Sequence, residues 1–375
     1  MKYNILFSDA VKPTTFGGGE KWILQAAKRL ENKGHHCSFI CRKNSLFQQK
    51  THAEKLSYNA IPFTNSFDIK SVLEIYRIIK QKNINIIICA TNLDIKLAGL
   101  AGRIAGIPVI SRQGLALISN KFKYKILIKY FTDSIITNTY SIKQQYENYP
   151  WFPKNHIQVI YNGVNINPPI FPDIKIKQLR KEYHIQTDEK IILSCGRLDH
   201  QKGFLYLIKA AQLAAESQQK WKFIILGEGA LRKQLETQIH NNHLSNVILA
   251  GYQEETNKFY QMADIFVLSS LSEGTPNVVL EAMAHHLPVI ATEVNGVKEI
   301  IVNGKNGYTI PPQNAQAIYK QLEQILSDTI MLNQLQEAGY ETVKNKFSWE
   351  RFTSEFNNYL TDVINHYEKN HHKNS

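Results

Sequence analysis

The sequence predicts an α/β fold of two Rossmann-like domains, each built on a doubly wound parallel sheet. Short apolar runs alternate with helical stretches, which is the pattern of βαβ units. This alternation is interrupted near residues 165–172, where three prolines follow an apolar run, and it then starts again. A chain of 375 residues is long enough for two complete hydrophobic cores.

The strands expected in the first half are short runs rich in isoleucine, valine and phenylalanine. They are expected at residues 4–7, 37–41, 84–89, 108–110, 134–137 and 158–165. A glycine-containing loop and a helix are expected over 17–31, between the first two strands. The last strand runs into the proline-containing segment, so the first domain is expected to cover residues 1–168.

The second half repeats the pattern over residues 169–349. Its strands are expected at 191–196, 223–226, 247–249, 265–268 and 288–290. Because these runs are apolar throughout, both faces of the sheet are expected to be buried. An amphipathic helix is expected from Phe347 to Tyr367 with Ser348 as its N-cap, and the His- and Lys-rich residues 368–375 are expected to form a disordered tail.

Positive charge is concentrated in the first half of the chain. Residues 1–165 contain 23 Lys/Arg and 9 Asp/Glu, a net charge of +14, whereas residues 166–375 contain 21 and 23, a net charge of −2. This asymmetry indicates an anionic partner for the first half: a lipid surface, a phosphorylated acceptor or a nucleic acid. Compositional drift in a chain rich in Lys, Asn and Ile is the alternative.

Residues 121–131 are both basic and aromatic. Helical spacing would place two stripes side by side: Lys121, Lys125 and Lys129, and Phe122, Ile126 and Tyr130. The first half of the segment fits a strand equally well, so periodicity does not decide between the two. Such a face suits docking on an anionic membrane. The alternative is a core helix with solvated lysines.

Several features favour a cytoplasmic location. No apolar run approaches the roughly 18–20 residues that span a bilayer. Residues 3–8 are too short and too weakly charged for a signal peptide and are expected to form the first strand. The four cysteines show no paired CxxC spacing and no histidine at a zinc-like distance, so they are expected to be reduced thiols.

The most informative segment is 272–284, which holds Glu273 and Glu281 on either side of a Gly-Thr-Pro turn that opens an apolar helix. It follows the expected strand at 265–268, and ligands of open α/β sheets bind at the carboxyl ends of strands. Two glutamates around an ordinary capped helix could also be simply solvated.

The turn between the two glutamates is expected to form an anion site. Thr275 suits the N-cap, and Pro276 suits the first helical position, where its missing N–H has no consequence. After Gly274, the backbone N–H groups at the helix N-terminus would face a phosphate, supported by the helix dipole. These groups belong to Asn277, Val278 and Val279.

In this segment the chain resembles the retaining glycosyltransferases of family 4, whose Glu-x7-Glu motif it matches at nearly every position. The resemblance is strongest over 191–310 and weaker over 1–41 and 84–165. It implies the GT-B architecture, in which two Rossmann-like domains face each other across a cleft. It also implies that the last helix, from about 350 to 367, belongs to the first domain.

The resemblance implies roles for residues of the second domain. Arg197 and Lys202, in the loop after Gly196, match the family's donor-phosphate Arg and Lys and would neutralise the departing diphosphate. Glu281 would accept hydrogen bonds from ribose hydroxyls, and Glu273 from the transferred sugar. A glycosidase with the two acids as catalytic pair is disfavoured, because a bound diphosphate would have no role in hydrolysis.

Further donor contacts are expected in loops that follow strands. In the first domain, Gly17, Gly18 and Gly19 would approach the diphosphate or the transferred sugar. In the second domain, the corresponding loop brings Gly227 and Glu228. The nucleotide base is expected at Tyr252. No Asp-x-Asp occurs in the sequence, so no metal and no cofactor are expected, and the nucleotide sugar is a substrate.

The acceptor side departs from the family pattern. Many members carry a histidine after the strand matching 108–110, and here Arg112 or Gln113 occupies that position, neither of which is a plausible general base. A front-face retaining mechanism can pass the acceptor proton to the departing phosphate oxygen, so a protein base is not required. Arg112 would bind an acceptor phosphate. Asp94 is the other candidate for activating the acceptor.

These features predict a cytoplasmic, metal-independent, retaining glycosyltransferase, with a peripheral position on the inner face of a membrane if the basic half binds lipid. It would use a UDP- or GDP-type sugar and a glycan or lipid-linked acceptor, in polysaccharide, lipopolysaccharide or glycolipid assembly. The alternatives are an epimerase of similar shape, an inactive sugar-nucleotide binder and a nucleic-acid-binding protein. Nucleic acid is disfavoured because no recognised binding module appears and aromatics accompany basic residues only at 121–131.

Overall fold

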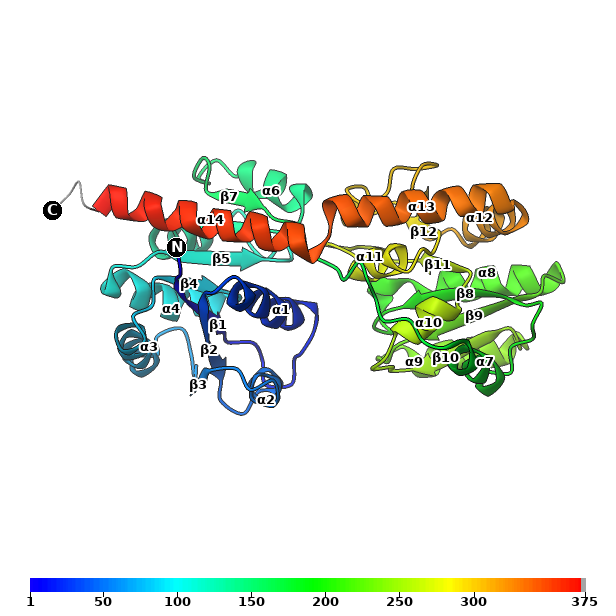
Figure 1. The fold of residues 1–375 in the computed structure, drawn as a ribbon, viewed down its shortest axis with the longest axis horizontal. Helices are drawn as coiled ribbons and strands as arrows, with labels where there is room; N and C mark the ends of the chain where they lie inside the picture. Colours follow the sequence, from blue (N-terminus) through cyan, green and yellow to red (C-terminus); the bar gives the residue numbers. More distant parts are fainter. Residues whose placement is uncertain (372–375) are drawn as a thin grey trace. The chain divides into compact units, whose positions relative to one another are not determined.

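The computed structural model describes residues 1–371 (Figure 1). The chain forms two compact units. One contains Met1–Asn162 together with the segment that begins at Glu350, and the other is Gly163–Trp349. The sequence places the first boundary six residues later, at 168, because the proline-containing segment resembles a linker.

The first unit is built on a seven-stranded sheet in which every neighbouring pair is parallel, with the order β3-β2-β1-β4-β5-β6-β7. This is the strand order of a doubly wound Rossmann-like sheet, extended by one strand. The strands are β1 (Asn4–Asp9), β2 (His36–Arg42), β3 (Tyr58–Ile61), β4 (Ile86–Cys89), β5 (Val109–Gln113), β6 (Ser134–Thr137) and β7 (Ile157–Val159).

Helices pack around this sheet. They are α1 (Gly18–Asn32), α2 (Leu46–Ala53), α3 (Ile69–Gln81), α4 (Asn92–Ala105), α5 (Phe122–Phe131), α6 (Tyr140–Glu147) and α14 (Trp349–His371). The last helix packs on α1, where the ring of Trp22 lies 5.5 Å from that of Phe352 and 5.7 Å from that of Phe356. It is also held by His35, whose Nε2 lies 2.7 Å from the amide oxygen of Asn357.

The second unit contains a six-stranded sheet, again parallel throughout, with the order β10-β9-β8-β11-β12-β13. Its strands are β8 (Lys190–Cys195), β9 (Trp221–Leu226), β10 (Val247–Gly251), β11 (Ile265–Leu268), β12 (Val289–Thr292) and β13 (Tyr308–Ile310). Its helices are α7 (Asp173–Glu182), η1 (His200–Lys202), α8 (Phe204–Glu216), α9 (Arg232–Asn241), α10 (Asn257–Met262), α11 (Asn277–Ala284), η2 (Asn295–Val297), α12 (Ala315–Ser327) and α13 (Thr329–Lys346).

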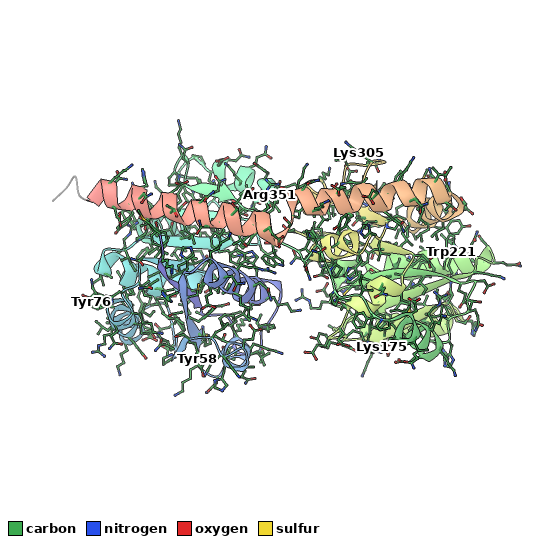
Figure 2. The ribbon with its side chains drawn as sticks, in the orientation of Figure 1. Tyr58, Tyr76, Lys175, Trp221, Lys305 and Arg351 are labelled. Atoms are coloured by element: carbon green, nitrogen blue, oxygen red, sulfur yellow. The ribbon has the colours of Figure 1, made fainter. Side chains whose placement is uncertain are left out.

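Buried apolar side chains from strands and helices form the core of the second unit. The central strands contribute Ile192, Phe223, Val267 and Ile290, each fully buried. At the start of β9, Trp221 packs its ring 5.8 Å from Tyr319 of α12 (Figure 2). The prediction of two Rossmann-like α/β domains is confirmed.

Four local expectations are wrong. The strand expected at 158–165 is the three-residue β7, after which the chain leaves the sheet. The strand expected to end at residue 110 continues to Gln113, because Arg112 and Gln113 pair in register with Ile136 and Thr137 of β6. Two edge strands, β3 and β13, are missing from the prediction because they are short and weakly apolar.

The fourth concerns the C-terminus. Residues 368–371, expected to be disordered, continue α14. The helix is extended by a hydrogen bond between Asn370 and His366, one turn apart. Residues 372–375 lie outside the described part of the chain. The segment 121–131, which periodicity left open, forms the helix α5. Within residues 1–371, no helix is long and apolar enough to span a bilayer.

Candidate functional site

Loops of the second unit meet at the carboxyl ends of its strands, where two glycines allow backbone-to-backbone contact. Gly227, after β9, has φ of +138°, and a Cβ built on it would lie 1.9 Å from the carbonyl oxygen of Gly196, after β8. A Cβ on Gly296 of η2 would lie 1.3 Å from the carbonyl oxygen of Gly274. Only glycine fits at these two positions, so the loops after β8, β9, β11 and β12 are locked together.

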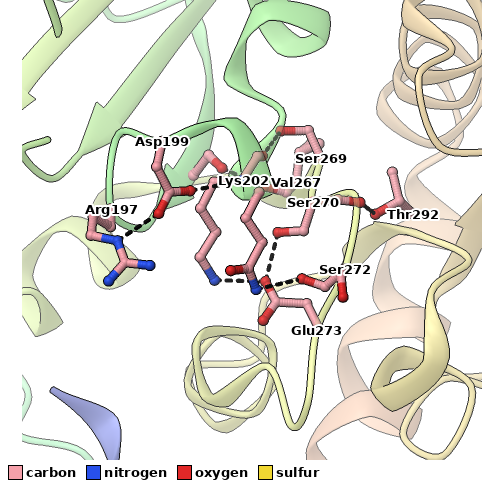
Figure 3. A network of polar contacts seen from close by, with 11 residues as sticks. Arg197, Asp199, Lys202, Val267, Ser269, Ser270, Ser272, Glu273 and Thr292 are labelled. Carbon is pink, nitrogen blue, oxygen red and sulfur yellow. Dashed lines mark hydrogen bonds and ion pairs between the residues drawn. The ribbon is translucent and has the colours of Figure 1, made fainter. Parts of the chain in front are cut away.

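The centre of the site is an ion pair between Lys202 and Glu273. Lys202 ends η1, a short helix whose N-cap Asp199 accepts a hydrogen bond from the Lys202 backbone N–H. Its Nζ lies 2.6 Å from Oε1 of Glu273, and the hydroxyl of Ser270 donates to the same oxygen at 2.6 Å (Figure 3). The Glu273 side chain is only 7% exposed. Breaking such a buried pair leaves an uncompensated charge, at a cost of about 3–5 kcal/mol.

Hydroxyl groups fix the backbone that carries this pair. The Ser269 hydroxyl donates to the Lys202 carbonyl at 2.9 Å, which ties the end of β11 to η1. The Thr292 hydroxyl of β12 donates to the Ser270 carbonyl (Figure 3). On the other side, Ser194 of β8 donates to the Val267 carbonyl at 2.6 Å. The pair is therefore held by three adjacent strands.

Arg197 lies in the same loop as Lys202. Its side chain is 71% exposed, and its Nε–H donates to Asp199 at 2.5 Å. An ion pair this exposed contributes little stability. The two terminal NH₂ groups of the guanidinium make no hydrogen bond with any residue in 1–371. They remain able to donate to an anion at the carboxyl end of β8.

The helix N-terminus after Glu273 differs from the expectation. α11 begins at Asn277, and Pro276 rather than Thr275 occupies the N-cap position. The N–H of Val279, expected to face a phosphate, donates instead to the Pro276 carbonyl at 2.9 Å. Pro276 lies one position earlier than expected because its ψ of 86° is outside the helical range. An anion site here would therefore use fewer backbone N–H groups than the three that were expected, because the N–H of Val279 is already hydrogen-bonded.

The other expected donor contacts have these positions. Glu281 lies in α11, and its Oε2 accepts a hydrogen bond from the hydroxyl of Tyr260 at 3.0 Å. Glu228 is turned toward α9, where it pairs with Arg232 at 2.5 Å. Tyr252 follows β10, and its side chain is 69% exposed. Tyr260 was not anticipated, because its role depends on a contact across 21 residues that no sequence spacing indicates.

In the first unit, Gly17, Gly18 and Gly19 open α1. The Gly17 N–H donates to Oε2 of Glu20 at 2.6 Å, so this glutamate caps its own helix. The Arg112 guanidinium lies over the Trp22 ring, 4.5 Å from its centroid. Burial lowers the pKa of Arg112 to about 10, although the nearby carboxyls of Glu20 and Asp9 act in the opposite direction.

The two other acceptor candidates are buried. Gln113 is 1% exposed and donates to the Ser111 hydroxyl at 2.8 Å. Asp94 caps α4, where its Oδ2 accepts from the N–H of Thr91 at 2.8 Å. Burial, reinforced by the charge of Asp9, raises the pKa of Asp94 well above its usual range.

Asp9, at the end of β1, was not singled out in the sequence. Its carboxyl is buried beside that of Asp94, and burial, together with the charge of Glu20, raises its pKa to about 7. Oδ2 of Asp9 and Oδ1 of Asp94 are both buried without a hydrogen-bond partner in the described chain. Two carboxyl oxygens in this situation are satisfied by retaining a proton.

Comparisons with known proteins identify the family to which the chain belongs. The family model for glycosyl transferases group 1 matches residues 175–342, and that for glycosyltransferase family 4 matches residues 16–167. The lipopolysaccharide core biosynthesis glycosyltransferase LpsE of Rhizobium meliloti is 31% identical over 248 residues, which cover 65% of this chain and 69% of that protein. The uncharacterized glycosyltransferase MJ1607 of Methanocaldococcus jannaschii is 32% identical over 61% of this chain, and the match spans 60% of that relative's length.

Solved structures extend the fold comparison to almost the whole chain. A glycosyltransferase from Rickettsia africae superposes with a TM-score of 0.86 at 22% identity, covering 97% of this chain and 99% of that one. Anabaena HepE, solved in complex with UDP and glucose, gives a TM-score of 0.83 at 19% identity and covers 96% and 100%. The resemblance seen in the sequence is therefore confirmed, and the chain belongs to glycosyltransferase family 4.

Proposed function

We propose that this glycosyltransferase moves a sugar from a nucleoside-diphosphate sugar to a glycan or lipid-linked acceptor, with retention of configuration and without a divalent metal. The observation that carries the proposal is the Lys202–Glu273 pair, which presents a cation and an anion at the ends of neighbouring strands. Arg197 adds a second cation from the same loop as Lys202.

The chemistry follows from these charges. As the bond between the sugar C1 and the diphosphate oxygen breaks, negative charge grows on that oxygen, and Lys202 and Arg197 stabilise it. Glu273 accepts a hydrogen bond from a sugar hydroxyl and keeps Lys202 oriented. The acceptor oxygen bonds to C1 from the same face, and its proton passes to the departing phosphate oxygen. These two cations, and the lack of Asp-x-Asp in the sequence, support a reaction without metal.

The donor is proposed to be a UDP- or GDP-type sugar. In support of UDP, Anabaena HepE has been solved with UDP-glucose, and one relative is a UDP-galactose-dependent galactosyltransferase of Escherichia coli. The latter is 25% identical over 79% of this chain. Within the second unit, the remaining donor contacts are proposed to come from Gly196, Gly227, Glu228, Tyr252 and the amides of α11.

The acceptor is proposed to be an intermediate of envelope polysaccharide, lipopolysaccharide or glycolipid assembly. Relatives named for lipopolysaccharide core and capsular polysaccharide biosynthesis support this setting. The Escherichia coli relative acts on a diphosphoundecaprenol-linked sugar. In this chain Arg112 is proposed to contact an acceptor phosphate, because its planar fork lies on Trp22 and can bind a phosphate through two hydrogen bonds.

The first unit is proposed to dock on an anionic membrane at the cytoplasmic face. On α5, Phe122 and Tyr130 are 73% and 58% exposed, and lysines lie between them in the sequence. The neighbouring α4 is tied to α5 by a hydrogen bond from Arg103 to the Tyr130 carbonyl, and its Ile104 is 58% exposed. Apolar side chains exposed among lysines are typical of interfacial helices.

The test combines donor binding with product analysis. Thermal shifts with UDP, GDP, ADP and their sugars identify the donor, because a ligand of the folded state raises its apparent stability. The donor is then incubated with a lipid-linked acceptor, with and without EDTA, and the product's anomeric configuration is determined by NMR. Retention without metal is expected. Inversion, loss of activity in EDTA, or conversion of the donor without any acceptor would each contradict the proposal.

A further inference from the structure

Tyr260 joins the α10 helix to a carboxylate of the site. Its side chain is 1% exposed, and its hydroxyl donates to Oε2 of Glu281 at 3.0 Å. The ring lies between two others: it stacks on His285 at 4.9 Å and is tilted against Phe266 at 5.8 Å. A hydroxyl buried among rings requires a partner, so the contact with Glu281 is a persistent feature of this unit.

The direction of this hydrogen bond is fixed. Burial, with the charge of Glu281 added, raises the pKa of Tyr260 well above its usual value of 10. The phenol therefore keeps its proton near neutral pH and donates a hydrogen bond to the carboxylate. One oxygen of Glu281 is thereby held by a donor that does not titrate.

His285 supports the arrangement from the end of the helix that carries Glu281. Its Nδ1 lies 2.8 Å from the Glu281 backbone carbonyl oxygen, so Nδ1 carries the proton and donates. Burial lowers the pKa of His285, which keeps the imidazole neutral near physiological pH. The Tyr260 ring therefore stacks on His285, and His285 is hydrogen-bonded to the backbone of Glu281. Both contacts hold Tyr260 close to the carboxylate that it binds.

We propose that Tyr260 is a positioning residue that holds the Glu281 carboxylate ready to accept hydrogen bonds from the ribose hydroxyls of the donor. The inference rests on the proposed function, because it assumes a nucleotide donor. Without the Tyr260 hydroxyl, the Glu281 carboxylate loses this restraint, and more of its ordering takes place when the ligand binds. Ordering one such side chain weakens binding by about 2- to 12-fold.

The test measures ribose recognition and has a matched control. Y260F removes only the hydroxyl and keeps the ring. Y319F makes the same change at Tyr319, whose hydroxyl donates to Glu323 at 2.9 Å within α12. Each protein is titrated calorimetrically with the nucleoside diphosphate that the wild type binds best and with its 2′,3′-dideoxy form. Y260F is expected to weaken binding of the ribose form by about 2- to 12-fold and binding of the dideoxy form by less than about two-fold. Y319F is expected to change neither affinity.

Each outcome decides between the hypotheses. Equal weakening of both ligands by Y260F would show a purely structural role and overturn the inference, and so would unchanged binding. E281A provides a second measurement. If Tyr260 acts only through Glu281, the double variant Y260F/E281A should bind the nucleoside diphosphate with the same affinity as E281A. A further loss of affinity in the double variant would count against the proposal. A wild type that binds no nucleoside diphosphate would refute the proposed function itself.

Discussion

Replacing Asp9 with asparagine should make the stability of the first unit less sensitive to a rise in pH from about 4 to about 8. The carboxyl of Asp9 is buried at the end of β1, and its pKa is raised from 3.8 to about 7 by burial and by the charge of Glu20. An acid with a raised pKa in the folded state contributes nothing below the unfolded value, where both states are protonated. Stability is then lost as the pH rises from about 4 to about 7 and stays low above it.

The size of the effect follows from that shift. Between pH 5 and pH 8 the unfolded state binds almost no proton at this position, while the folded state releases its proton near pH 7. At about 1.36 kcal/mol per pKa unit, the wild type loses about 3 kcal/mol from Asp9 over this interval. The amide of the D9N variant has no charge to bury, so the difference in unfolding free energy, D9N minus wild type, should rise by about 3 kcal/mol between the two pH values.

The assay must report on the first unit alone, because a chain with two compact units need not unfold in one step. Urea-dependent hydrogen exchange, followed by mass spectrometry of peptides from β1 and β4, gives that local free energy. D68N is the control. Asp68 caps α3, and although burial acts to raise its pKa, hydrogen bonds from Thr64 and Ser71 outweigh this and lower it, so it is ionised in both states from about pH 5 to 8. If the local unfolding free energies of D9N and of the wild type changed in parallel with pH, the reasoning would be refuted.

Three further outcomes are expected. K202M should lower turnover by about 10²–10³-fold, measured by kinetics, because a cation beside the departing phosphate is lost. It should also destabilise the second unit by about 3–5 kcal/mol, measured by urea unfolding, because the buried Glu273 loses its ion-pair partner. E273Q/K202M should recover stability but not activity. F122E should reduce flotation with anionic vesicles several-fold without changing donor affinity, and equal flotation would disprove the docking surface. G227A should destabilise the second unit by more than about 3 kcal/mol, whereas G106A, with φ of +74° and no atom within 4 Å of the added Cβ, should cost only about 1 kcal/mol.

The sequence was sufficient for most of the strands and for the edge of the sheet at which Lys202 and Glu273 lie. Buried parallel strands are continuous apolar runs, and Lys202 and Glu273 each follow such a run closely, so their edge of the sheet could be predicted. The direct contact between Lys202 and Glu273 could not be predicted, because 71 residues separate them. The sequence gives the types of the two side chains but not the distance between their charged atoms. Tyr260 was missed for the same reason. Arg112 was placed after the strand expected at 108–110, whereas it lies within β5, because the end of a strand depends on its pairing with the neighbouring strand.

The protonation state of a carboxyl group is a further property that only the structure provides, and it bears on the acceptor. Glu273 and Asp94 both lie near the carboxyl ends of parallel strands, yet their surroundings differ. Glu273 has an ammonium and a hydroxyl at 2.6 Å, which stabilise a carboxylate. Asp94 has no ion pair within 4 Å among the described residues and is buried close to the charge of Asp9, so its pKa is raised well above its usual range and the protonated form is favoured. A protonated, buried acid cannot take a proton from an acceptor hydroxyl. This supports the proposal that the acceptor's proton passes to the departing phosphate oxygen, with the cations of the second unit lowering the energy of that oxygen as the bond to C1 breaks.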